Sequence, residues 1–249
     1  MSYCGLSIGN VYIYEYLLIP LAIISLGVAF YGQRQFLRRG KTTINLLYAI
    51  VFIIFGARIV IAMIPYFIAS QRYYNYNTLF AFETLSYWLG DVMSLILGFV
   101  TLLELNFIHG INLKTLSLLV VPCVFLGVLW IILNSVFSTS VYYFLVSIPL
   151  IFCSLYGFMQ YDYLKKNQIP FSHLTWLIPG LVLGIYNIIT TATYYTCFLF
   201  FSTITIQWFL LMVAMYCLIK YIHIRDSCNS NGHSAYQPIE QETTRGDTV

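Results

Sequence analysis

Seven long apolar runs divide this chain, and they constrain its fold more than any other feature. The runs lie at about residues 11–31, 44–69, 79–104, 115–134, 141–159, 174–195 and 199–219. A helix needs roughly 20 apolar residues to cross the hydrocarbon layer of a membrane, and each run is close to that length. The sequence therefore predicts an all-α, polytopic membrane protein, built as a seven-transmembrane helix bundle.

The last two runs form an almost continuous apolar stretch from residue 174 to residue 219. Only the polar patch TTATYYT interrupts it. One helix over this whole range would be far too long for a bilayer. We therefore expect a short connection at the patch, as is normal between antiparallel neighbours.

The composition excludes several classes of protein. Of the 249 residues, 60% are hydrophobic and 8% are charged, whereas a soluble domain has roughly 25% charged residues. The net charge of +3 is not gathered into a basic patch, so nucleic acid is not an expected partner. We expect a protein with almost no extramembrane domain, surrounded mainly by membrane lipid.

Basic residues gather on one side of the predicted bundle, and this sets its orientation. The opposite side has only Arg72, whereas the loops after the first, third and fifth runs and the C-terminal flank hold Arg34, Arg38, Arg39, Lys41, Lys114, Lys165, Lys166, Lys220 and Arg225. Cytoplasmic loops carry an excess of Lys and Arg. The pattern predicts a non-cytoplasmic N-terminus at residues 1–10, a membrane domain at 11–223 and a disordered cytoplasmic tail at 224–249. Ends on opposite sides require an odd number of spans, which agrees with seven.

Three ionisable residues fall within the second and third runs. Arg58 lies near the middle of its run, Glu83 lies near the start of the next, and Asp91 lies further in. A charge at this depth is costly unless it finds a partner or water. In antiparallel helices, Glu83 and Asp91 would lie on either side of the level of Arg58. We expect an intramembrane cluster of Arg58 with Glu83, Asp91 or both, which either joins the two helices or lines a polar path.

A second polar set lies in the sixth and seventh runs and includes Asn187, Thr191, Thr205 and Gln207. Such side chains commonly form hydrogen bonds between membrane helices, which is the favoured interpretation; a ligand or water cavity is the alternative. Glu15 and Glu104 lie near the ends of their runs. Their side chains are expected to reach the membrane interface, so neither is assigned a buried role.

The sequence shows no pattern of catalytic or metal-ligating residues. The four histidines lie at helix ends or in the tail, and the six cysteines have no metal-ligand spacing. Membrane hydrolases, desaturases and haem proteins need such residues inside the bundle, and a Ser or Cys nucleophile needs a base nearby. The sequence therefore predicts no enzyme, no metal site and no cofactor.

The C-terminal tail carries a short candidate sorting motif. Tyr236 and Ile239 in AYQPIE match the tyrosine-x-x-bulky-hydrophobic pattern that clathrin adaptors bind by strand addition. The last residues, Asp247, Thr248 and Val249, are a weaker candidate for binding a PDZ groove. The tail therefore predicts cytosolic adaptor proteins as partners.

Three stretches resemble a known group of seven-helix membrane proteins: LLYAIVFIIFGARIV, which contains Arg58, YWLGDVMSLILGFVTLLELNFIHG and AYQPIEQ. They are similar to the plant tobamovirus-multiplication proteins and the related animal lysosomal orphan-receptor-like proteins, and the likeness would cover most of the chain. The resemblance implies an endomembrane or lysosome-type protein that recruits cytosolic partners, and it assigns no site residue. Rhodopsin-like receptors match less well, because the Asp-Arg-Tyr and Asn-Pro-x-x-Tyr motifs and a retinal-binding lysine are missing.

The sequence leaves three functions open. The first is a receptor-like or scaffold protein of an endomembrane (endosome or lysosome-like) or of the plasma membrane, whose cytoplasmic loops and tail bind partners. The second is a small transporter or channel with Arg58, Glu83 and Asp91 as its polar path. The third is a diverged G-protein-coupled receptor with a ligand pocket among the aromatic outer ends.

Overall fold

The computed structural model describes residues 7–8, 11–40, 42–69, 76–105, 107–108, 113–135, 139–193, 197–198 and 201–233. Within these ranges the chain forms seven α-helices: α1 (Ile13–Arg38), α2 (Thr43–Ala69), α3 (Tyr76–Glu104), α4 (Leu113–Ser135), α5 (Thr139–Lys166), α6 (Ile178–Thr193) and α7 (Thr203–His233). A 3₁₀-helix, η1 (Phe171–Leu177), leads into α6. The predicted all-α fold is confirmed.

Four two-residue strands form small hairpins at one end of the bundle. Strands β1 (Ser7–Ile8) and β2 (Val11–Tyr12) pair antiparallel just before α1. Strands β3 (Cys197–Phe198) and β4 (Phe201–Ser202) pair antiparallel between α6 and α7. The predicted break between the last two apolar runs is therefore confirmed, and the second hairpin forms the connection.

Five segments of the described residues are long and apolar enough to cross a membrane: Thr43–Ile64, Thr84–Glu104, Lys114–Ile132, Phe171–Thr190 and Thr205–Cys228. They belong to α2, α3, α4, η1 with α6, and α7. Helices α1 and α5 are not in this set, which was drawn from the described residues alone. The five segments indicate a multi-pass membrane protein.

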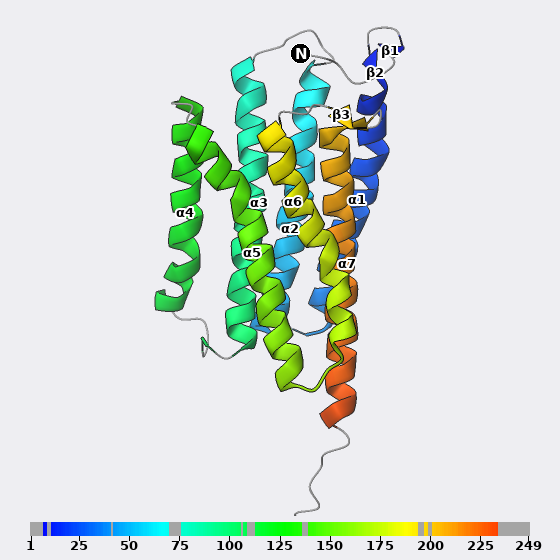
Figure 1. The fold of residues 1–249 in the computed structure, drawn as a ribbon, viewed down its shortest axis with the longest axis vertical. Coiled ribbons are helices and arrows are strands. Elements are labelled where there is room, and N and C mark those ends of the chain that lie inside the picture. The colour runs from blue at the N-terminus through cyan, green and yellow to red at the C-terminus, as the bar shows by residue number, and fades with distance from the viewer. Residues whose placement is uncertain are drawn as a thin grey trace, which may run out of the picture.

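The helices lie side by side along the long axis of the molecule (Figure 1). Helix α1 contacts α2 and α7, α3 contacts α2 and α5, and α6 lies between α5 and α7, so these six helices form a closed ring. Helix α4 packs on the outside, against α3 and α5. It exposes an apolar face that includes Val121, Val124, Phe125, Val128 and Ile131. Such a face is suited to lipid, where apolar side chains need no cover.

Large aromatic side chains from α1, α2 and α7 form part of the buried core. Phe36, Tyr48, Phe52 and Tyr221 are completely buried. The ring of Phe36 stacks on those of Tyr48 and Phe52, with centroid distances of 5.0 and 5.7 Å. Stacked rings of this kind add to the stability gained from their burial. This packing fixes α2 between α1 and the rest of the ring.

Three helices continue past the apolar runs that predicted them. Helix α1 ends at Arg38, α5 at Lys166 and α7 at His233. The end of α7 lies within residues 224–249, which the sequence assigns to the tail. The extra turns of α7 carry Arg225, which bonds to Glu104 of α3, and Asp226, which bonds to Arg39 just after α1. Hydropathy does not register such contacts, because they depend on residues far away in the sequence.

Candidate functional site

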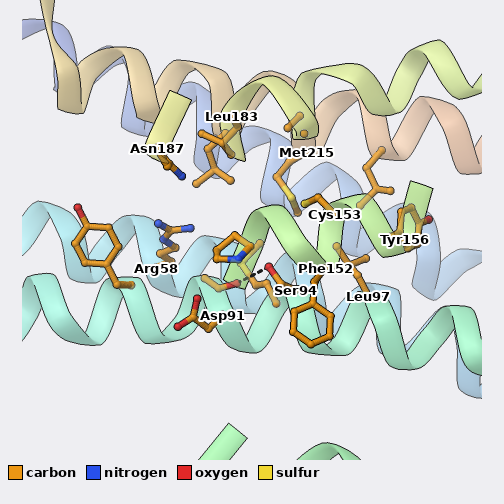
Figure 2. Close-up of a pocket in the computed structure, with 18 of the residues that line it drawn as sticks. Arg58, Asp91, Ser94, Leu97, Phe152, Cys153, Tyr156, Leu183, Asn187 and Met215 are labelled. Carbon is orange, nitrogen blue, oxygen red and sulfur yellow. Dashed lines mark hydrogen bonds between the residues drawn. The ribbon is translucent and has the colours of Figure 1, made fainter. Parts of the chain in front are cut away.

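A cavity of about 110 Å³ lies inside the bundle, between α2, α3, α5, α6 and α7 (Figure 2). Most of its wall is apolar and includes Leu97, Phe152, Leu183 and Met215. A single water needs about 10–15 Å³ measured in this way, so the cavity has room for several waters or one small organic molecule.

Arg58 forms part of the cavity wall. It lies within the candidate span of α2, and only 9% of the residue is exposed. Its Nε donates a long hydrogen bond of 3.4 Å to Ser86 Oγ of α3, and its guanidinium lies 5.4 Å from the ring centroid of Trp208 of α7. A Cβ added at Gly90 would lie 2.7 Å from Nη1. The glycine therefore leaves the space that the guanidinium occupies.

Asp91 lies in the wall of the same cavity and is 2% exposed. Its Oδ2 accepts a hydrogen bond of 2.8 Å from Trp130 Nε1, which joins α3 to α4. In Figure 2 the carboxylate points away from Arg58. Among the described side chains, no ion pair joins Arg58 to Asp91. The structure thus brings the two charges to one cavity with separate partners, and the side chain of Glu83 is outside the described residues.

The second polar set is divided between the cavity and its surroundings. Asn187 of α6 and Gln207 of α7 line the cavity, and Thr205 is buried on α7. The side chain of Thr191 lies outside the described residues. Within the described part of the chain, no hydrogen bond reaches the side-chain amide of Asn187 or of Gln207. Polar groups in such a position usually bond to water or to a ligand.

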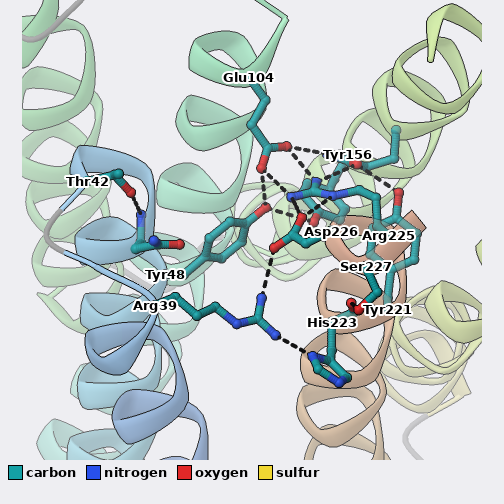
Figure 3. A network of polar contacts seen from close by, with 12 residues as sticks. Arg39, Thr42, Tyr48, Glu104, Tyr156, Tyr221, His223, Arg225, Asp226 and Ser227 are labelled. Carbon is teal, nitrogen blue, oxygen red and sulfur yellow. Dashed lines mark hydrogen bonds and ion pairs between the residues drawn. The ribbon is translucent and has the colours of Figure 1, made fainter. Parts of the chain in front are cut away.

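A second polar site lies where α3 and α7 meet, at the end of the bundle that carries most of the basic residues (Figure 3). Both terminal nitrogens of the Arg225 guanidinium donate to the Glu104 carboxylate, Nη1 to Oε2 and Nη2 to Oε1, each at 2.9 Å. The two side chains are only 5% and 4% exposed. A bidentate, buried pair of this kind is strong and fixes the geometry of both partners.

The sequence-based expectation that Glu104 has no buried role is wrong. Its carboxylate is held inside the bundle by Arg225. From the sequence alone, Arg225 served only as one of the basic residues that set the orientation. The two residues lie at the same predicted end of the third and seventh spans, with opposite charge. That signal was present in the sequence and would have suggested the pair.

Three more side chains complete the hydrogen bonds of this pair. Gln160 of α5 donates to Glu104 Oε2 at 2.8 Å, and its Oε1 accepts from Arg225 at 3.0 Å and from Tyr221 at 2.8 Å. Tyr48 of α2 donates to Glu104 Oε1 at 3.1 Å. Four helices, α2, α3, α5 and α7, therefore meet in one network. Sequence reasoning missed Tyr48, Gln160 and Tyr221.

The edge of the network reaches Arg39, the residue after the end of α1. Asp226 accepts from Arg225 and from Arg39, the latter at 2.9 Å, and Arg39 also lies 3.0 Å from His223 Nδ1. The Arg225 guanidinium covers the ring of Tyr163 at 5.0 Å. Burial raises the pKa of the Tyr163 phenol above its usual 10.0, although Arg225 opposes the shift, so the group stays neutral at physiological pH.

Tyr156 of α5 belongs to both sites. It lines the cavity, and its hydroxyl lies 3.2 Å from that of Tyr48, which in turn bonds to Glu104. Figures 2 and 3 show the residue at the end of the cavity and at the edge of the network. A movement of Tyr156 would therefore disturb both.

The structure gives little support to the other kinds of site considered from the sequence, namely a metal site and the sorting motif. In the part of the chain that is described, no group of three or more His, Cys, Asp or Glu could hold a metal ion. Tyr236 and Ile239 of the sorting motif lie beyond the described residues.

Comparisons of the chain with models of known protein families, with curated proteins and with solved structures find no match. The cavity and the network must therefore be interpreted from their own geometry.

Proposed function

We propose that this chain is a receptor-like seven-helix membrane protein that binds a small ligand in the cavity and transmits its presence to the cytoplasmic end. In this proposal all seven helices cross the membrane, the N-terminus is non-cytoplasmic and the tail is cytoplasmic. The excess of Lys and Arg at the network end supports that orientation.

The observation that carries the proposal is the double role of Tyr156. A ligand in the cavity contacts this ring, and the hydroxyl of the same residue is linked through Tyr48 to the Glu104–Arg225 pair. A ligand that shifts Tyr156 would alter a network that holds four helices together. Signalling across a protein requires two sites that each shift the equilibrium of the same structural element.

The tail supplies the partner side of the proposal. A cytoplasmic, polar segment with Tyr236 and Ile239 at sorting-motif spacing is suited to cytosolic adaptors. The expected location is an endomembrane of the endosomal or lysosomal type, or the plasma membrane. A Tyr236→Ala variant of the tagged protein should move to another compartment; if its location is unchanged, the sorting motif has no role.

A small transporter is the second candidate, because Arg58 and Asp91 both lie in the wall of the cavity. Polar and charged residues inside a membrane bundle often mark a substrate path. In this alternative the Glu104–Arg225 network closes one end of the path and opens during transport. A flux of the bound solute into proteoliposomes would favour this function, whereas binding without flux favours a receptor.

The proposed function is tested with purified full-length protein in nanodiscs. A panel of small anionic, cationic and neutral solutes is screened for thermal stabilisation of the wild type, of Ala214→Phe and of Ala57→Phe. Ala214 lines the cavity, and Ala57 faces outwards on α2, so the second variant is the matched control. At least one solute should stabilise the wild type and Ala57→Phe but not Ala214→Phe. If no solute distinguishes these proteins, ligand binding in the cavity is contradicted.

Transmission to the cytoplasmic end needs its own measurement. Spectroscopic labels on unnatural amino acids at the exposed positions Arg38 and Lys166 would report the spacing of α1 and α5. A stabilising solute should change this spacing in the wild type. The Tyr156→Phe variant should keep the binding and lose the change, because only the hydroxyl link to Tyr48 is removed. An unchanged spacing in the wild type would contradict the receptor-like role.

A further inference from the structure

We infer that the cavity takes a small carboxylate with an apolar body, and this inference rests on the proposed function. The cavity is polar at one end and apolar along the rest. Arg58 and Asn187 lie together at the polar end, and Leu97 and Phe152 lie towards the other end (Figure 2). An amphipathic molecule would match this division.

Arg58 makes the polar end a site for an anion. Its direct partners among the described residues are the neutral hydroxyl of Ser86 and the ring of Trp208. Asp91 attracts the guanidinium through space, but no carboxylate of the described residues lies within ion-pair distance of it. A buried charge whose counter-charge is not in direct contact is costly at membrane depth. A carboxylate entering the cavity would remove that cost and form two parallel hydrogen bonds with the guanidinium.

The surrounding groups favour one negative charge over other ligand chemistries. The amide of Asn187 offers N–H donors at the same end of the cavity as Arg58, and the amide of Gln207 also lines the cavity. Asp91 is the nearest described acid in the wall, but one of its oxygens already accepts from Trp130 and the group points away from Arg58. An ammonium group could reach only the second oxygen of Asp91, and it would enter a cavity that already holds the like charge of Arg58. A phosphate dianion would bring a second charge that no described cation in the cavity balances.

The volume limits the size of the body. An engineered apolar cavity of about 150 Å³ holds benzene. The cavity of about 110 Å³ is smaller than that, so it suits a ligand no larger than benzene, such as butyrate. Most of such a molecule would lie against the apolar wall, where burial of each CH₂ group contributes about 0.8 kcal/mol.

The test compares matched probes that differ in the head group. Butyrate, butyramide, 1-butanol and butylammonium are titrated against the full-length protein in nanodiscs of uncharged lipid, with thermal stabilisation as the readout. Butyrate should bind about tenfold or more tightly than the neutral probes, because hydrogen bonds to charged groups are the stronger ones. Arg58→Gln should remove this preference, and Arg34→Gln, which changes an exposed arginine, should keep it.

The outcomes separate the inference from the function on which it rests. If a neutral or cationic probe binds as tightly as butyrate, and Ala214→Phe abolishes that binding, the ligand site stands and the carboxylate inference is overturned. If no probe and no solute of the broader panel binds, both are overturned. Where Arg58→Gln does not fold, a preference for butyrate over butyramide that is present in Ala57→Phe and absent in Ala214→Phe supports the inference. If the preference for the carboxylate probe is the same in Ala57→Phe and Ala214→Phe, the inference is overturned.

Discussion

Among single residues, Glu104 and Arg225 give the sharpest test of the network, because each neutralises a charge that the bundle buries. Glu104→Gln leaves the Arg225 guanidinium without its bidentate partner. Breaking one half of a buried pair typically costs about 3–5 kcal/mol. We expect a loss of this size in the free energy of unfolding, measured by detergent-induced unfolding of the purified protein.

The control and the double variant make that result specific. Lys165→Gln changes an exposed charge, and its effect should stay within about 0.5 kcal/mol. Glu104→Gln combined with Arg225→Gln should cost less than the sum of the single variants, since neither charge is then left alone. Additive losses would show that the pair is not coupled, contrary to the structure.

The hydrogen bond between Trp130 and Asp91 supports a second prediction at this scale. Trp130→Phe keeps an aromatic ring against Tyr87, on which Trp130 stacks at 5.5 Å, but removes the donor to the buried carboxylate. An unsatisfied buried acceptor costs roughly 1–3 kcal/mol. The same unfolding measurement should show this loss, whereas Trp176→Phe, at an exposed tryptophan, should be close to neutral. Equal effects of the two substitutions would contradict the proposed role of the bond.

Among the helices, the contact of α1 with α2 depends on a glycine. A Cβ at Gly32 would overlap the ring of Phe52, which is completely buried, and no atom lies within 4 Å of a Cβ at Gly27 in the same helix. Gly32→Ala should therefore destabilise the protein by about 1–3 kcal/mol through overpacking. Gly27→Ala should be neutral or stabilising by up to about 1 kcal/mol, because alanine favours a helix. Thermal unfolding in detergent checks both, and a harmless Gly32→Ala would show that α1 and α2 are further apart than described.

The helices themselves were predictable from the sequence, and their ends were less so. Hydropathy over roughly 20 residues is a local signal, and the centres of all seven apolar runs lie in α-helices. The extension of α7 to His233 was missed because it depends on bonds from Arg225 and Asp226 to Glu104 and Arg39. Such pairs bring together residues that are distant in the chain, and a periodic pattern does not show them.

The candidate site was predictable to a similar extent. Arg58 and Asp91 stand out as charges within apolar runs, and both line the cavity. Tyr48, Tyr156 and Gln160 gave no such signal, since the chain has 22 tyrosines and a neutral side chain in an apolar run has many explanations. Their roles appear only when the helices are packed.

For the whole molecule, the remaining question is how the bundle lies in its membrane, and the positions of the two ends answer it. Tags are fused to both termini, and the protein is made in microsomes, whose outer face is cytoplasmic. Added protease should remove the C-terminal tag and leave the N-terminal tag protected, because the basic end of the bundle is retained on the cytoplasmic side. With detergent present, both tags should be lost, which controls for protease-resistant structure. Loss of both tags without detergent would require an even number of spans. Both termini would then lie on the cytoplasmic side. The start of α1 and the Glu104–Arg225 network lie at opposite ends of the bundle, so α1 and α7 could not both cross the membrane.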